Sequence, residues 1–248
     1  MRLLIGFMLS ASILIKSKMS KEITICLTSC GRFDLLSKSI ESLIKFWDGP
    51  KPDGRNVALI INEDSGLPVP DNISEMLDHW TGGNFAFCFG DHNQVKAIDR
   101  IYEKVESEYI FHTEDDWEFT RSGFIQPSLD ILESDPKILQ VWIRNQNDRN
   151  GHPVIGMRNK TPNGTQYQKL SRNYRNVWCG HSWNPGLRRK SDYDLVAPFS
   201  SYMTGNTLHT EAAIGQAYKK LGFYAATLLT GYVRHIGGNQ SLSKQEIK

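Results

Sequence analysis

The chain has 248 residues, of which 40% are hydrophobic, so it can bury an ordinary core and is not intrinsically disordered. Its 29 basic and 27 acidic residues leave a formal net charge of +2, which gives no argument for nucleic-acid binding. The four cysteines match neither a zinc pattern nor a disulfide framework, and we interpret them as free thiols of a reducing compartment.

The first 21 residues form a hydrophobic extension with two interpretations. Its apolar stretch, residues 3–15, is shorter than the roughly 20 residues that a membrane span needs. It is either a weak anchor at a membrane surface or a dispensable extension before a start at Met19. We therefore expect a cytoplasmic protein, and a weak membrane association through the N-terminus stays open.

Short apolar strands alternate with amphipathic helices in the first half of the chain. The pattern predicts strands at 22–28, 56–62, 85–89 and 109–111, and helices from Asp34, over 73–80 and over 93–105. This alternation is typical of a mainly parallel sheet covered by helices, which binds ligands at the carboxyl ends of its strands. Polar clusters follow Thr28, Ile61 and Phe111, at three such ends.

Three consecutive carboxylates, Glu114, Asp115 and Asp116, follow the fourth predicted strand. Because an unpaired buried carboxylate is costly, these side chains must face solvent or a counter-charge. Carboxylate oxygens suit Mg²⁺ and Mn²⁺, which commonly bridge protein carboxylates and substrate phosphates. The triplet therefore indicates a metal–diphosphate site, and a solvated acidic turn is the alternative.

The second half is less regular. We predict a helix over 124–133, a strand over 139–143, a polar excursion over 145–176 and a strand over 177–183. A helix over 211–221 that ends at Gly222, a strand over 223–228 and a mobile tail from Gly237 follow. The basic run 188–190 is most simply a solvated face, with contact to donor phosphates as the alternative.

Four segments together resemble family 2-like glycosyltransferases of GT-A fold. Residues 23–32 resemble the opening strand of that family with its Thr and Arg, and residues 60–66 the second strand, whose acidic end contacts the nucleotide base. Residues 93–97 resemble the polar start of the helix before the metal motif, and residues 114–116 fall where the Asp-any-Asp motif belongs. The resemblance covers residues 22–240.

This resemblance implies an α/β fold: a single GT-A domain with a mainly parallel central sheet, flanking helices and a smaller mixed-sheet region in the C-terminal half. It divides the chain into a nucleotide-sugar-binding half, 22–119, and an acceptor-binding half, 120–240, followed by a tail, 241–248. The implied function is a metal-dependent inverting transfer of a sugar from a nucleotide-diphosphate sugar to a hydroxyl of a glycan, lipid-linked or protein acceptor. A UDP-sugar is favoured, and GDP and dTDP stay open.

The resemblance also assigns residues. Donor contacts are expected from Thr28, Arg32, Asp64, Asn93, Lys96, Glu114 and Asp115. Asp116 and His235 are the expected ligands of Mn²⁺ or Mg²⁺, although a lone His is often structural. Glu114 replaces the commoner Asp at the first position of the motif, which leaves the sharing of roles within the triplet open.

On the acceptor side, the resemblance implies contacts from Trp183 and Asn184, with a plain core position as the alternative for Trp183. Glu211 is the expected catalytic base, which would deprotonate the acceptor hydroxyl. Its alternative is an acid favoured by a helix N-terminus, and His209 is the competing base. Two other functions stay open: a catalytically silent GT-A domain that binds sugars or partners, and a sugar nucleotidyltransferase.

Overall fold

The computed structural model describes residues 22–51, 57–90, 92–175 and 177–238. The predicted N-terminal extension and the tail beyond 240 lie outside these ranges. No helix in the described ranges is long and apolar enough to cross a membrane.

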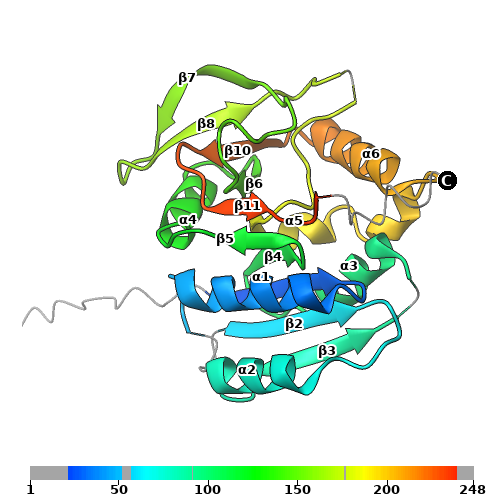
Figure 1. Ribbon diagram of the computed structural model, residues 1–248. Coiled ribbons are helices and arrows are strands. Elements are labelled where there is room, and N and C mark those ends of the chain that lie inside the picture. Colours follow the sequence, from blue (N-terminus) through cyan, green and yellow to red (C-terminus); the bar gives the residue numbers. More distant parts are fainter. Residues whose placement is uncertain (1–21, 52–56, 91, 176, 239–248) are drawn as a thin grey trace, which may run out of the picture.

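The described chain builds one large sheet in the order β3-β2-β1-β4-β9-β6-β10-β8-β7 (Figure 1). The first four strands of this order are parallel, and the sheet becomes mixed from β9 onward. The strand bounds are β1 (Ile23–Ser29), β2 (Val57–Glu63), β3 (Phe85–Phe89), β4 (Tyr109–Glu114), β6 (Ile138–Trp142), β7 (Val154–Lys160), β8 (Gln166–Leu170), β9 (Gly186–Arg189) and β10 (Tyr224–Leu228). The predicted α/β class with a mixed C-terminal region is therefore confirmed.

Helices cover both faces of this sheet. One face packs against α1 (Phe33–Phe46), α2 (Asp71–Thr81) and α4 (Ile125–Ser134). The other packs against α3 (Gln94–Tyr102), α5 (Lys190–Asp194), the short 3₁₀ helix η1 (Phe199–Tyr202) and α6 (Thr207–Lys220). Successive side chains of a strand point to opposite faces, so Ile25 and Leu27 of β1 belong to the first core and Cys26 to the second.

A second, two-stranded sheet pairs β5 (Trp117–Phe119) with β11 (Val233–His235), and neither strand was predicted from the sequence. Each has three residues, too few for a visible alternation. The pairing sets His235 opposite Trp117, directly after the acidic triplet. Figure 1 shows this small sheet beside the carboxyl end of β4.

Three predictions for the second half are wrong. The predicted polar excursion 145–176 contains the β7–β8 hairpin. Most side chains of β7 are exposed, so its sequence does not look like that of a half-buried strand. No strand covers 177–183, where Trp178 makes only an isolated bridge to Tyr174. The basic run 188–190 is not a solvated face, because Arg188 lies in β9 between β4 and β6 and is 3% exposed.

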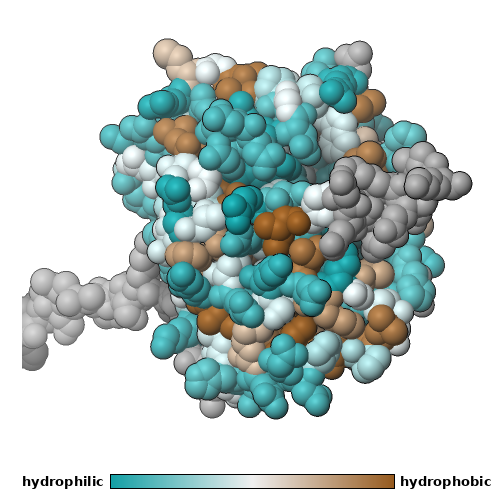
Figure 2. All heavy atoms as spheres, in the orientation of Figure 1, coloured by the Kyte–Doolittle hydropathy of each residue, from teal (hydrophilic) through white to brown (hydrophobic). Residues whose placement is uncertain are grey.

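The surface in Figure 2 is mostly hydrophilic, with hydrophobic residues scattered singly or in small groups. Exposed apolar residues of this kind are ordinary on a globular protein. The four cysteines are free, as predicted, and three of them are buried.

Candidate active site

The acidic triplet lies at the carboxyl end of β4, in the turn that leads to β5. The backbone N–H of Asp115 donates to the carbonyl of Thr28 at 3.0 Å, so the end of β1 fixes this turn. Ser39 of α1 accepts from the Trp117 N–H at 3.2 Å, and its Oγ lies 2.7 Å from the Asp115 carbonyl. The main chain that presents the triplet is thus held from two sides.

Asp115 is engaged by its surroundings. Its carboxylate accepts from Arg32 through Nε at 3.1 Å and through Nη2, and from the hydroxyl of Ser29 at 3.3 Å. Burial raises the pKa of Asp115 to about 6, although the charge of Arg32 opposes this shift. This carboxylate positions Arg32, and both of its oxygens accept hydrogen bonds.

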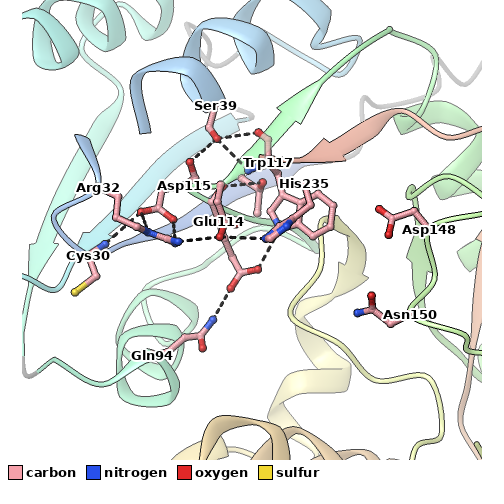
Figure 3. A network of polar contacts seen from close by, with 12 residues as sticks. Cys30, Arg32, Ser39, Gln94, Glu114, Asp115, Trp117, Asp148, Asn150 and His235 are labelled. Carbon is pink, nitrogen blue, oxygen red and sulfur yellow. Dashed lines mark hydrogen bonds and ion pairs between the residues drawn. The ribbon is translucent and has the colours of Figure 1, made fainter. Parts of the chain in front are cut away.

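Asp116 differs from Asp115 because one of its oxygens is unused. Oδ2 accepts from Arg32 Nη1 at 3.0 Å and lies 3.3 Å from His235 Nε2, whereas the buried Oδ1 has no partner among the described atoms. Figure 3 shows Arg32 and His235 approaching the acidic residues from two sides. Burial alone would raise the pKa of Asp116, but the His235 hydrogen bond and the Arg32 charge outweigh it and lower that pKa.

Glu114, the last residue of β4, accepts hydrogen bonds from two side chains. Gln94 Nε2 donates to its Oε1, and the indole of Trp117 donates to its Oε2 at 3.2 Å. Burial, together with the neighbouring charge of Asp116, raises the pKa of Glu114 well above its usual value. Glu114 is therefore a partner inside the network rather than a solvated surface residue.

Glu211 enters the same region from the first turns of α6 and is 7% exposed. Its Oε1 accepts from the backbone N–H of Trp183 at 2.8 Å. Burial raises the pKa of Glu211 to about 7, against the hydrogen bonds from Trp183 and Ser182 and the charge of Arg188. A carboxylate with this pKa can accept a proton near neutral pH.

The peptide unit between Ser182 and Trp183 links Glu211 to a buried cation. Its N–H binds Glu211, and its carbonyl accepts from Arg188 Nη2 at 3.0 Å and from Gln140 Nε2 at 3.3 Å. This role of Arg188 was not predictable from the sequence, because two adjacent arginines in a four-residue strand look like a run of surface charges.

The acidic triplet and Glu211 line one cavity of about 560 Å³. The predicted site residues that it brings together are Thr28, Arg32, Asp64, Asn93, Glu114, Asp115, Asp116, Trp183, Asn184, Glu211 and His235. Lys96 and His209 are not among its lining residues, and both are exposed. The two halves of the chain therefore contribute to a single site.

The position of Lys96 follows from the start of α3. Asn93 is the N-cap, and its side chain accepts from the Lys96 backbone N–H at 3.0 Å. Gln94, which the sequence analysis did not single out, points to Glu114 instead. Residues two apart on a helix do not face each other, and here Gln94 lines the cavity whereas Lys96 is exposed to solvent.

Two further predicted site residues, Trp183 and Asp64, line the cavity although they are largely buried. Trp183 lines the cavity, yet it is only 4% exposed and packs edge-on against His181 and Phe199, as a core residue does. Asp64 is buried at the carboxyl end of β2, and its Oδ1 has no partner among the described atoms. Burial raises the pKa of Asp64, and the backbone hydrogen bond from Asn93 opposes that shift.

The residues present fit a divalent cation that is completed by a substrate. Within the described residues, no group of three or more His, Cys, Asp and Glu side chains could hold a metal by itself. Asp116 nevertheless offers a buried oxygen without a partner, and the His235 ring lies beside it. Mg²⁺ in particular is usually bound by one or two carboxylates together with substrate phosphates.

No protein-family model and no curated protein matches the sequence. Solved structures do match its fold. TarS of S. aureus superposes with a TM-score of 0.58 at 12% identity over 86% of this chain and 36% of its own. GalNAc-T7, solved with UDP, GalNAc and Mn²⁺, gives a TM-score of 0.61 at 8% identity over 87% of this chain and 43% of its own.

The mannosyltransferase PcManGT from Pyrobaculum calidifontis, solved with GDP-Man and Mn²⁺, gives a TM-score of 0.52 at 9% identity over 86% of this chain. The chain has the GT-A glycosyltransferase fold. It spans between about a third and a little over half of the length of these GT-A proteins. In this GT-A domain, the acidic triplet ends the fourth parallel strand of the sheet.

Proposed function

We propose that this GT-A domain is a metal-dependent, inverting glycosyltransferase that uses a nucleoside diphosphate sugar, with UDP as the favoured nucleotide. One observation carries the proposal. Asp116, with its unpartnered buried oxygen, and Glu211, with its pKa of about 7, come from different halves of the chain and line one cavity. A metal ligand and a general base in one cavity are the two groups that such a transfer requires.

The donor would lie on the N-terminal half. Asp116 and His235 would hold Mn²⁺ or Mg²⁺, and a bound cation of this kind neutralises a leaving diphosphate. Arg32 donates to Asp115 and Asp116 and is fixed beside that position. Thr28, Asp64 and Asn93, at the carboxyl ends of β1 and β2 and at the start of α3, would contact the nucleoside.

Glu211 would deprotonate the acceptor hydroxyl as that oxygen attacks the anomeric carbon, and the sugar–phosphate bond breaks on the opposite side. The nucleoside diphosphate leaves with the electron pair of that bond, so the configuration at the anomeric carbon inverts. Asn184, adjacent to Trp183, would contact the acceptor, a glycan, a lipid-linked sugar or a protein hydroxyl. Trp183 orients Glu211 through its backbone N–H.

Asp116→Ala is the first test. We expect loss of Mn²⁺-dependent hydrolysis of UDP-sugars by at least about 100-fold, because the variant removes the triplet oxygen that has no partner within the described part of the chain. Hydrolysis is measured by release of UDP with Mn²⁺, with Mg²⁺ and with EDTA.

Glu118→Gln is the matched control, because Glu118 lies two residues away, pairs with Arg234 and does not line the cavity. It should keep full activity. Full activity of Asp116→Ala with an unchanged metal requirement would show that the triplet is misassigned. If the wild-type protein binds UDP-sugars without turning them over, it is a silent GT-A domain, and pyrophosphate-dependent exchange would indicate a nucleotidyltransferase.

A further inference from the structure

The cavity has a second set of lining residues that the proposed transfer does not use. Arg149 and His152 come from the loop after β6, and Tyr174, Arg175 and Trp178 come from the segment after β8. We call these five residues the basic–aromatic set. All of them belong to the half of the chain that does not carry the acidic triplet.

The two arginines of this set have no carboxylate partner among the described residues. Arg149 donates through Nη1 to the neutral amide of Gln146 at 2.7 Å, and its buried Nε has no partner. The Arg175 guanidinium lies 5.0 Å from the centre of the Tyr174 ring. By contrast, the nearby Arg144 pairs with Asp148 at 2.7 Å. The cavity therefore contains two positive charges that no described acid neutralises.

The chain holds this set in place. The Tyr174 hydroxyl donates to the carbonyl of Asn150 at 3.0 Å, which ties the two segments together. His152 bonds to the Ser171 carbonyl at 2.8 Å, and its ring packs 5.1 Å from that of Tyr174. Tyr174 and Trp178 exchange two backbone hydrogen bonds, each of 2.9 Å. The rings of Tyr174, His152 and Trp178, fixed in this way, need little ordering when a ligand binds.

We propose that the basic–aromatic set is an acceptor subsite for a sugar that carries an oxyanion, either a phosphate or a carboxylate. The aromatic rings offer faces for the sugar, and the guanidinium groups match the geometry of oxyanions. This inference rests on the proposed function for its division of the cavity between donor and acceptor.

Charge decides where such an acceptor must lie. Glu114, Asp115, Asp116 and Glu211 line the cavity and would repel an anionic group placed among them. Arg149 and Arg175, which line the cavity without a described carboxylate partner, attract it. Figure 3 shows Asn150, the residue after Arg149, set apart from the triplet across the site.

The test measures binding directly, so that it does not depend on turnover. Glucose 6-phosphate, glucuronic acid and neutral glucose are titrated by calorimetry into the wild-type protein in EDTA, which keeps metal-mediated phosphate binding out of the result. We expect at least one of the charged sugars to bind at least about tenfold more tightly than glucose, because hydrogen bonds to charged groups are strong. Arg149→Gln with Arg175→Gln should abolish this difference.

Arg158→Gln is the matched control, because Arg158 is an exposed cation on β7 that does not line the cavity. It should bind like the wild type. Equal binding of the three sugars by the wild type, or a preference that survives in the double variant, would overturn the subsite. Mn²⁺-dependent hydrolysis of UDP-sugars, measured in parallel on the wild-type protein, reports on the proposed function alone.

Discussion

Single residues set the chemistry of this site through the backbone as well as through side chains. Arg188 and Glu211 bind the two ends of the peptide unit between Ser182 and Trp183. A cation on the carbonyl polarises the peptide group and strengthens the hydrogen bond that its N–H donates to the carboxylate. Arg188 therefore positions Glu211 and favours its ionised form, in agreement with its lowering effect on the Glu211 pKa.

Arg188→Met should move the acidic limb of the kcat–pH profile to higher pH. The cation lowers the pKa of Glu211, so its removal raises that pKa, and the base stays protonated up to a higher pH. We expect a shift of about 1 pH unit, and Arg188→Lys should retain most of the wild-type profile. Gln140→Leu removes a neutral donor from the same carbonyl and should change kcat without moving the limb. An unmoved limb in Arg188→Met would show that its charge does not act on the base.

At the level of elements, α1 supplies the hydrogen-bond acceptors that a neighbouring strand would otherwise offer to β5. The N–H groups of Trp117 and Phe119 donate to the hydroxyls of Ser39 and Ser42, at 3.2 and 2.9 Å. These two serines are three residues apart and therefore share one face of α1. These two hydroxyls, rather than a third strand, fix the turn that holds Asp116.

Ser39→Ala should lower the free energy of unfolding by about 1–3 kcal/mol, because the buried Trp117 N–H would lose its partner. Urea denaturation measures this loss. Ser37→Ala is the control on the same helix, since the Ser37 hydroxyl bonds only to exposed Glu41, and it should cost less than about 0.5 kcal/mol. Equal losses in the two variants would mean that the hydroxyl does not support β5.

Much of the first half was predictable because its elements follow simple periodicities. In β1 and α1, apolar residues recur at the spacing of a strand and of a helix, and both elements lie where the pattern placed them. The small β5–β11 sheet was not predictable, because it depends on contacts between residues more than 100 positions apart. The roles of Gln94 and Arg188 were not predicted for a related reason. Their hydrogen-bond partners lie on other elements, and the residues next to them in the sequence do not indicate these contacts.

For the whole molecule, buried ionisable groups make stability depend on pH in two opposing ways. Burial raises the pKa of Glu211 and Asp115, so the native state keeps protons that the unfolded chain has released, and stability falls as pH rises from about 4 to 7. Burial lowers the pKa values of His112 and His181, so the unfolded chain takes up protons first, and stability falls as pH drops below about 6.5. These opposing effects predict a stability maximum at mildly acidic pH.

Glu211→Gln isolates one of these contributions. Above pH 7 the wild type must bury a charged carboxylate, whereas glutamine stays neutral and can accept the same N–H of Trp183. Relative to the wild type, the variant should gain on the order of 2 kcal/mol more at pH 8 than at pH 5, while sugar transfer is lost. Denaturation in urea at both pH values, without metal, measures the difference. An identical relative stability at the two pH values would contradict the raised pKa.

The peptide unit between Ser182 and Trp183 also bears on how such a site can change during evolution. Its contacts to Glu211 and Arg188 are made by main-chain atoms, which every residue except proline supplies in full at position 183. Selection for a correctly oriented base therefore places little restriction on the identity of that side chain. A site of this kind can keep its geometry at very low sequence identity, such as the 8–13% between this chain and solved structures of the same fold.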